Sequence, residues 1–176
     1  RIPPLKYSDK GVINDTLLKI LKLNVRLPDS FEGDLNAQIA ACEIGRRRIS
    51  DLEVRYSAKV LKNIFWDLLN RSESMTRQAI MALPDGTHAY FDYLDNDGID
   101  LDTPIKIEVS VRVMGDSVEI DFSGTSQQVR GPFNLMPSGA YAAAYFAVHA
   151  LTNPNIPTNG GCFRPIKLLL PEKSIV

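Results

Sequence analysis

Two polar loops in the second half of the chain carry side chains suited to binding a small anionic or carbonyl group. The first contains the run Ser123-Gly124-Thr125-Ser126, and the second extends from Asn153 to Arg164. Backbone N–H groups and hydroxyls in a turn of small residues can hold an anion or a carbonyl oxygen. Asn134, Asn159 and Arg164 would complete such a site, because Arg offers a planar fork for a carboxylate and Asn offers both a donor and an acceptor. This hypothesis predicts that Gly124 and Arg164 share one cleft.

The same polar groups also have a structural interpretation. Polar side chains in loops commonly satisfy nearby backbone groups, so these residues can equally tie two long loops together. A similar choice applies to Asp34 and Gln38, which lie near the apolar seam of a long predicted helix and need either structural partners or a ligand. The predicted substrate-binding residues are Asp34, Gln38, Asp121, Ser123, Gly124, Ser126, Asn134, Asn159 and Arg164.

The sequence predicts no catalytic residue and no metal ligand. It contains no GxSxG, P-loop or GxGxxG pattern. A serine nucleophile needs a base within reach, and nothing in the sequence supplies one for Ser123 or Ser126. The run Asp95–Asp100 is similar to half of a calcium-binding loop, but the twelfth position counted from Asp95 is Lys106, where that loop requires Glu. A turn rich in Asp and Asn is therefore the favoured interpretation of this run.

Apolar periodicity predicts the elements that position these loops. Helices are expected from Asn14 to Leu27, from Asp29 to about Tyr56 and from Ser57 to about Leu83, because apolar residues recur there at helical steps. The period then changes to two, which predicts strands over 88–93, 105–113 and 117–122 with a tight turn at 114–116. An apolar helix over 138–151 and a final strand complete the prediction.

This order of elements predicts an α+β fold, with N-terminal helices packed on an antiparallel sheet and a buried C-terminal helix. A length of 176 residues suits one domain. We expect a single domain over 1–176, mainly helical in 1–83 and built of sheet plus helix in 84–176. The chain starts at Arg1 and stops just after a strand-like run, so it is expected to be a fragment of a longer polypeptide.

Composition excludes several classes of protein. The chain has 20 basic and 21 acidic residues without a basic stripe, which argues against a nucleic-acid partner. No apolar run approaches the roughly 20 residues of a spanning helix, and no secretory signal is present. Cys42 and Cys162 lack the CxxC spacing of a zinc site and fit a reducing compartment. These features predict a cytoplasmic protein.

Five short motifs, taken in order, resemble one known family. They are Arg1-Ile2-Pro3-Pro4, the run 33–41 (GDLNAQIAA) followed by Gly45 and Arg47-Arg48, the run 121–126 (DFSGTS), the run 131–134 (GPFN) and the run 159–166 (NGGCFRPI). Together they span essentially the whole chain and resemble the hydantoinase B/oxoprolinase family. That family includes the B-type subunits of ATP-dependent hydantoinases, the C-terminal half of 5-oxoprolinase and a subunit of acetone and acetophenone carboxylases.

The resemblance implies a function for the larger assembly. A hydantoinase A-type partner is expected to bind ATP and phosphorylate the substrate, and the B-type subunit is expected to open a lactam or imide ring of that small molecule. A divalent metal is implied in the full complex, but the family's metal-ligand segments lie upstream of this chain, so the fragment alone is expected to be inactive. The alternatives are a subunit of an ATP-dependent ketone carboxylase and a non-catalytic module for subunit assembly.

Overall fold

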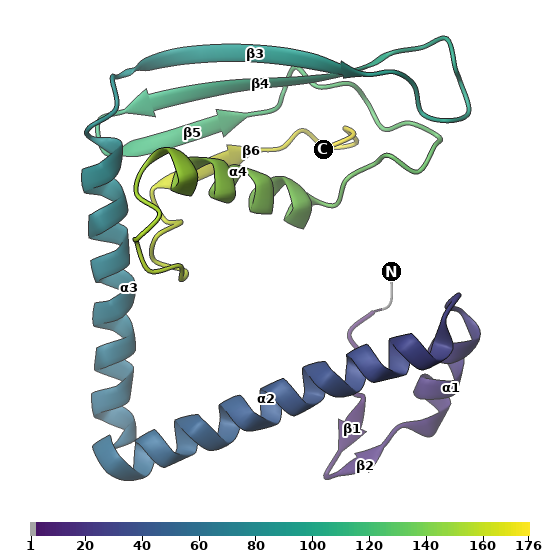
Figure 1. The fold of residues 1–176 in the computed structure, drawn as a ribbon, viewed down its shortest axis with the longest axis vertical. Helices are drawn as coiled ribbons and strands as arrows, with labels where there is room; N and C mark the ends of the chain where they lie inside the picture. The colour runs from purple at the N-terminus through teal and green to yellow at the C-terminus, as the bar shows by residue number, and fades with distance from the viewer. Residues whose placement is uncertain (1–2) are drawn as a thin grey trace. The chain divides into compact units, whose positions relative to one another are not determined.

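The computed structural model describes residues 3–176 and divides the chain into two compact units, residues 1–61 and residues 62–176. Figure 1 shows the elements of each unit. The first two residues of the Arg1-Ile2-Pro3-Pro4 motif lie outside the described residues. Helix α3 (Ala58–Ile80) begins in the first unit, and its residues from 62 onward belong to the second.

The first unit starts with a small hairpin that periodicity does not predict. Strands β1 (Ser8–Asp9) and β2 (Val12–Ile13) pair antiparallel across Lys10 and Gly11. Both turn residues have positive φ, at 49° and 85°, as a two-residue type I′ turn requires. Helix α1 (Asp15–Leu23) follows, and the Asn14 side chain caps it by accepting a hydrogen bond from the Leu17 N–H.

Helix α2 (Pro28–Tyr56) has the predicted length but neither the predicted start nor the predicted burial. It starts at Pro28, one residue before the predicted Asp29, and has no side-chain cap. None of its residues is buried, and Ile44, for example, is 56% exposed. The expectation that this helix packs through an apolar seam is wrong for this chain. Apolar periodicity indicates which side of a helix can be buried, but burial also requires a neighbouring element that packs against that side.

The second unit is built on a four-stranded sheet in the order β3 (Gly86–Leu94), β4 (Ile105–Met114), β5 (Ser117–Asp121) and β6 (Ile166–Leu169). The first three strands are antiparallel and confirm the predicted hairpins. Strand β6 pairs parallel with β5, so the sheet is mixed and not purely antiparallel. A parallel partner needs a long connection, and α4 (Pro137–Leu151) lies within it.

The core of the second unit lies between one face of this sheet and α4, which run side by side in Figure 1. Ala140, Ala144 and Val148 recur every four residues and form the buried side of α4. Phe146 and Leu151 are 76% and 75% exposed, so α4 is buried along one side only, which corrects the prediction of a buried helix. The core cluster consists of Ile80, Val113, Val118, Ile120, Ala144, Val148, Ile166 and Leu168.

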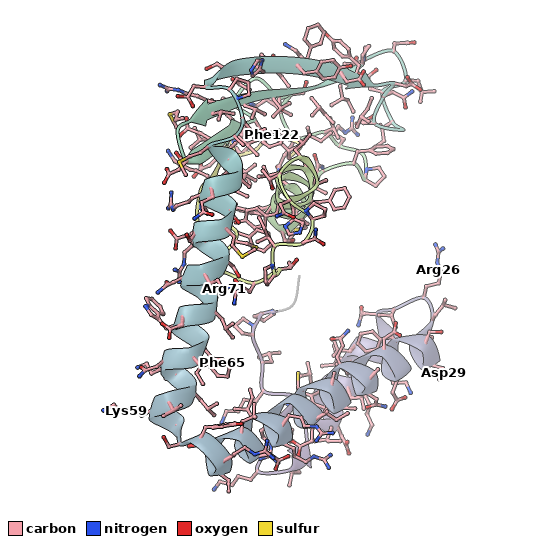
Figure 2. The ribbon with its side chains drawn as sticks, turned by 60° about the vertical axis from the view of Figure 1, so that its left-hand side comes forward. Arg26, Asp29, Lys59, Phe65, Arg71 and Phe122 are labelled. Atoms are coloured by element: carbon pink, nitrogen blue, oxygen red, sulfur yellow. The ribbon has the colours of Figure 1, made fainter. Side chains whose placement is uncertain are left out.

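The α+β class is confirmed by these helices and strands. The end of α3 contributes Ile80 to the core, while its remaining turns in the second unit carry exposed side chains such as Phe65 and Arg71 (Figure 2). Among residues 3–176, no helix combines the length and the apolar character that crossing a membrane would require.

Candidate functional site

The two polar loops lie at opposite ends of one strand pair. Val118 is level with Ile166, and Asp121 is level with Leu169. Arg164 therefore precedes the start of this strand pair, while Gly124 follows its end. The prediction that Gly124 and Arg164 share one cleft is wrong, because β6 runs parallel to β5 and carries the second loop to the other end.

The run Ser123–Ser126 is not a free anion-binding turn. The Ser123 N–H donates to the Asp121 carboxylate at 2.8 Å, the Thr125 N–H donates to the Phe122 carbonyl at 2.9 Å, and the Ser126 N–H donates to the Lys106 carbonyl at 2.9 Å. The chain's own acceptors thus use these three donors. Among the described residues, the Gly124 N–H and the Ser123 hydroxyl have no partner.

The hydroxyls of this run extend the sheet. The Thr125 hydroxyl donates to the Glu108 carbonyl at 2.9 Å and accepts from the Glu108 N–H at 3.1 Å. The Ser126 hydroxyl accepts from the Lys106 N–H at 3.0 Å. A Cβ at Gly124 would overlap the Glu108 carboxyl group, so the present position of that side chain against the turn depends on glycine.

Asn134 closes its own loop. Its side-chain oxygen accepts from the Val129 N–H at 2.9 Å, and its amide donates to the Val129 carbonyl at 2.7 Å and the Gly131 carbonyl at 3.3 Å. Gly131 in turn donates its N–H to the buried Asp97 carboxylate at 3.1 Å. These contacts agree with the structural interpretation, in which polar side chains of the loop satisfy nearby backbone groups.

The Asp97 carboxylate also organises the turn after β3. It accepts from the backbone N–H groups of Ile99 at 2.8 Å and Asp100 at 2.7 Å. Hydrogen bonds from Asp100 and Ile99, with weaker help from Gly131 and Arg130, lower the pKa of Asp97. The predicted turn rich in Asp and Asn is confirmed. Among residues 3–176, no group of three or more His, Cys, Asp or Glu side chains is arranged to hold a metal ion.

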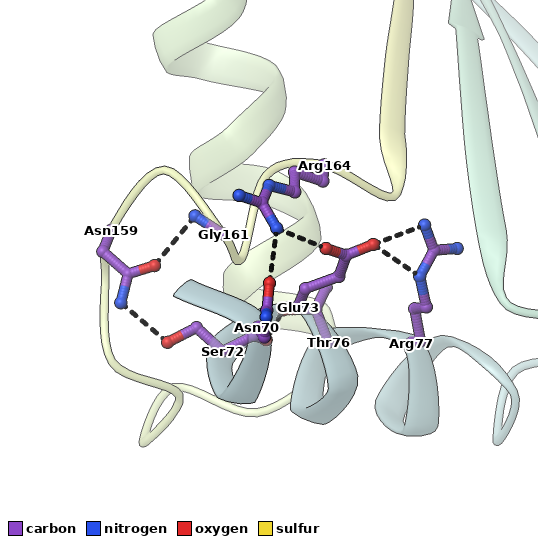
Figure 3. Close-up of polar contacts among 8 residues, drawn as sticks. All are labelled: Asn70, Ser72, Glu73, Thr76, Arg77, Asn159, Gly161 and Arg164. Carbon is purple, nitrogen blue, oxygen red and sulfur yellow. Dashed lines mark hydrogen bonds and ion pairs between the residues drawn. The ribbon is translucent and has the colours of Figure 1, made fainter. Parts of the chain in front are cut away.

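The loop before β6 lies against α3, and Figure 3 shows the polar contacts between them. The Asn159 amide donates to the hydroxyl of the buried Ser72 at 2.7 Å, and its oxygen accepts from the Gly161 N–H at 2.8 Å. A Cβ at Gly161 would lie 1.9 Å from the carbonyl oxygen of Leu69. Backbone therefore contacts backbone at this point, which only glycine permits.

Arg164 joins the same helix through one end of its guanidinium. Its Nη1 donates to the side-chain oxygen of Asn70 at 3.0 Å and to Glu73 at 2.8 Å. The guanidinium carbon lies 5.1 Å from the centre of the Trp66 ring, a cation–π distance. This contact orients Arg164 along α3.

Glu73 is the centre of the cluster in Figure 3. Its second oxygen accepts from two Arg77 nitrogens at 3.0 and 2.8 Å, and Arg77 also pairs with Asp116 at 3.1 Å. Hydrogen bonds from Arg164 and then Arg77 lower the pKa of Glu73. An ionised carboxylate between two guanidinium groups positions them and is a poor proton donor at neutral pH.

The structure therefore groups the predicted residues in three places. Asp34 and Gln38 are exposed on α2 in the first unit. Asp121, Ser123, Gly124, Ser126 and Asn134 lie at or beyond the end of β5, and Asn159 and Arg164 lie against α3. The sequence prediction missed the polar side of α3, although Ser72 within its apolar stripe was an available signal.

This arrangement supplies hydrogen-bond donors and fixed charges. In the part of the chain that the structure describes, no base contacts the hydroxyl of Ser123. Binding and positioning are the chemistry that these residues can perform.

Comparison with known proteins agrees with the motifs. The family model Hydantoinase B/oxoprolinase matches residues 1–176. A relative from Pseudomonas sp. (strain NS671), provisionally named as the B-type subunit of a D-/L-hydantoinase, is 36% identical over 97% of this chain and 31% of its own length. The crystal structure of the ATP-dependent caprolactamase from Pseudomonas jessenii is similar with a TM-score of 0.88 and 26% identity, over 99% of this chain and 30% of that one.

A third similarity concerns the fold alone. A nucleotide-free structure of acetone carboxylase matches with a TM-score of 0.84 and 15% identity, over 99% of this chain and 24% of that one. The chain thus spans less than a third of the length of the hydantoinase subunit and of the caprolactamase chain. Because the family model covers every residue, the chain belongs to the hydantoinase B/oxoprolinase family.

Proposed function

We propose that this chain is part of the B-type subunit of an ATP-dependent enzyme that opens a cyclic amide ring, a lactam or an imide. The observation that carries the proposal is the match of all 176 residues to the hydantoinase B/oxoprolinase family, together with similarity to a hydantoinase subunit and a caprolactamase. An A-type partner would bind ATP and activate the substrate. A cytoplasmic location remains a prediction.

The chemistry of ring opening is consistent with a supporting role for these residues. Hydrolysis of an unactivated amide requires stabilisation of developing negative charge, which fixed N–H and guanidinium donors can provide. It also requires proton transfer, and no base among residues 3–176 contacts the Ser123 hydroxyl. We therefore assign catalysis, and any divalent metal, to other parts of the complex.

Several predicted residues of the second unit carry donors that the described part of the chain does not use. These donors are the Ser123 hydroxyl, the Gly124 N–H and the Nε and Nη2 of Arg164, which contact no acceptor among residues 3–176. We retain these as proposed substrate contacts, and Asp34 and Gln38 remain predictions in the first unit. Asp121, Ser126, Asn134 and Asn159 bond to other parts of the chain, and we propose that they position the loops.

The test is ATP-dependent turnover by a complex of this B-type subunit with its A-type partner. Hydantoin, 5-oxoproline and caprolactam would be compared, with and without ATP, by the carboxylate that each releases. Ring opening of any one that requires both ATP and both subunits is expected. Absence of ring opening with all three cyclic amides would contradict the proposal.

The fold similarity to acetone carboxylase favours a second candidate, a subunit of a ketone carboxylase. Acetone with bicarbonate in the same assay distinguishes it, because only that candidate predicts ATP-dependent fixation of labelled bicarbonate.

A non-catalytic assembly module predicts a third result. The chain would co-purify with the A-type subunit, and Arg164→Ala or Asn159→Ala would leave turnover unchanged.

A further inference from the structure

Arg164 is held in place on one side of its guanidinium and is free on the other. Both N–H groups of Nη1 are used, one by Asn70 at 3.0 Å and one by Glu73 at 2.8 Å. Trp66 lies against the guanidinium at 5.1 Å from the ring centre. Among the described residues, no acceptor contacts Nε or Nη2. About a third of the Arg164 side chain is solvent-accessible, so a ligand could reach these nitrogens.

The free Nε–Nη2 edge has the geometry of a bidentate receptor. Two parallel N–H groups in one plane match the two oxygens of a carboxylate, and each such bond is charge-assisted. An arginine side chain normally loses rotamer freedom when it binds a ligand. Here Asn70, Glu73 and Trp66 have already fixed the side chain, so less entropy is lost on binding.

We propose that the Nε–Nη2 edge of Arg164 binds a carboxylate group of a small molecule. A singly charged planar group fits better than a phosphate dianion, because Glu73 occupies the neighbouring nitrogen and repels additional negative charge. Trp66 is 59% exposed and offers an apolar surface beside the edge for the carbon skeleton of the ligand.

The identity of the natural carboxylate follows from the ring chemistry. Hydrolysis breaks the ring C–N bond, places the water oxygen on the carbonyl carbon as a carboxylate, and leaves a hydrogen on the nitrogen and one proton in solution. The ring-opened product thus carries the group that Arg164 would bind. This identification rests on the proposed function, whereas carboxylate binding by Arg164 does not.

The test uses the full 176-residue chain and the fluorescence of Trp66, its single tryptophan. Acetate is titrated at constant ionic strength with chloride as the balancing anion, and phosphate is titrated in parallel. We expect a saturable change with acetate. Arg164→Lys keeps the charge but removes the fork, and it is expected to weaken acetate binding at least about fivefold.

Two further variants make the result specific. Arg71→Gln removes a positive charge from the same helix at a residue without a described partner, and it should leave acetate binding unchanged. Asn70→Ala keeps Arg164 but loosens its orientation, and it should weaken acetate binding even if Arg164→Lys fails to fold. The proposal would be overturned if Arg164→Lys and Asn70→Ala bound acetate as tightly as the unmodified chain, or if Arg71→Gln weakened acetate binding as much as they do. A response to chloride or tighter binding of phosphate would also overturn it. Turnover by the complex is a separate measurement, so the two proposals fail independently.

Discussion

Gly161 marks one of the tightest backbone contacts in the second unit. A methyl group at this position would lie 1.9 Å from the carbonyl oxygen of Leu69, and backbone on α3 cannot move aside without disturbing the helix. Gly161→Ala is therefore expected to lower the free energy of unfolding by at least about 2 kcal/mol, measured by urea denaturation. Gly160→Ala is the matched control, because its methyl group would meet only the Leu69 side chain, at 3.8 Å. Equal losses for the two variants would contradict the proposed contact.

The Glu73 cluster predicts a dependence of stability on pH. Arg164 and then Arg77 lower the pKa of Glu73 below its ordinary value of 4.5, so the folded state favours the ionised form. The stabilisation is fully present above the ordinary pKa and is lost as the pH falls through the lower folded pKa.

Glu73→Gln is therefore expected to reduce the free energy of unfolding at pH 7 by about 1 kcal/mol, a modest value because the partners are partly solvated. The difference between the variant and the unmodified chain should shrink as the pH falls below 4.5 and through the lowered pKa of Glu73, as measured by denaturation at several pH values. A difference that stays constant over the whole acidic range in which the chain remains folded would mean that ionisation of Glu73 is not its cause.

Local polar contacts could be predicted from the sequence, and distant ones could not. The Asn14 cap and the Asp97 turn involve neighbours within three residues, where residue type and spacing determine the partner. Asn159 bonds to Ser72 across 87 positions, and no local pattern contains that partner. The proposed cleft failed for the same reason, since the direction of β6 decides where Arg164 lies.

At the scale of elements, α4 offers a direct test of the core. Ala144 is 6% exposed and belongs to the core cluster under the sheet, whereas its neighbour Ala143 is exposed. Ala144→Leu should overpack this contact and lower the free energy of unfolding by about 1–3 kcal/mol. Ala143→Leu should change it by less than about 0.5 kcal/mol, because leucine and alanine differ little in an exposed helix position. The free energies of unfolding of both variants are measured by urea denaturation. Similar losses in the two variants would mean that Ala144 does not lie on the buried side of α4.

The elements themselves were largely predictable, because each is periodic over its own length. The predicted long helices and the three antiparallel strands are present, with ends shifted by a few residues. Two features were not predictable. The β1–β2 hairpin has strands of two residues, too short for a period, and the burial of α2 depends on a covering surface rather than on its own sequence.

At the scale of the whole molecule, the exposed edge of the sheet is the most consequential surface of the second unit. Strand β3 is at the edge, and seven of its nine residues are exposed. Tyr90, Phe91 and Tyr93 are 69%, 54% and 53% exposed. Stable proteins usually protect such an edge with lysine, proline or a covering element, and β3 contains neither lysine nor proline.

The isolated 176-residue chain is therefore expected to self-associate through β3. Tyr90→Lys places a charge in the middle of the edge and should lower the weight-average mass at high protein concentration, measured by sedimentation equilibrium. Leu101→Lys is the control, because Leu101 is 67% exposed but lies in the turn beyond the strand. If both variants lower the mass equally, general hydrophobicity and not edge pairing drives the association. If only Tyr90→Lys does so, backbone pairing at β3 is the cause, since the two substitutions change charge and apolar exposure in similar ways.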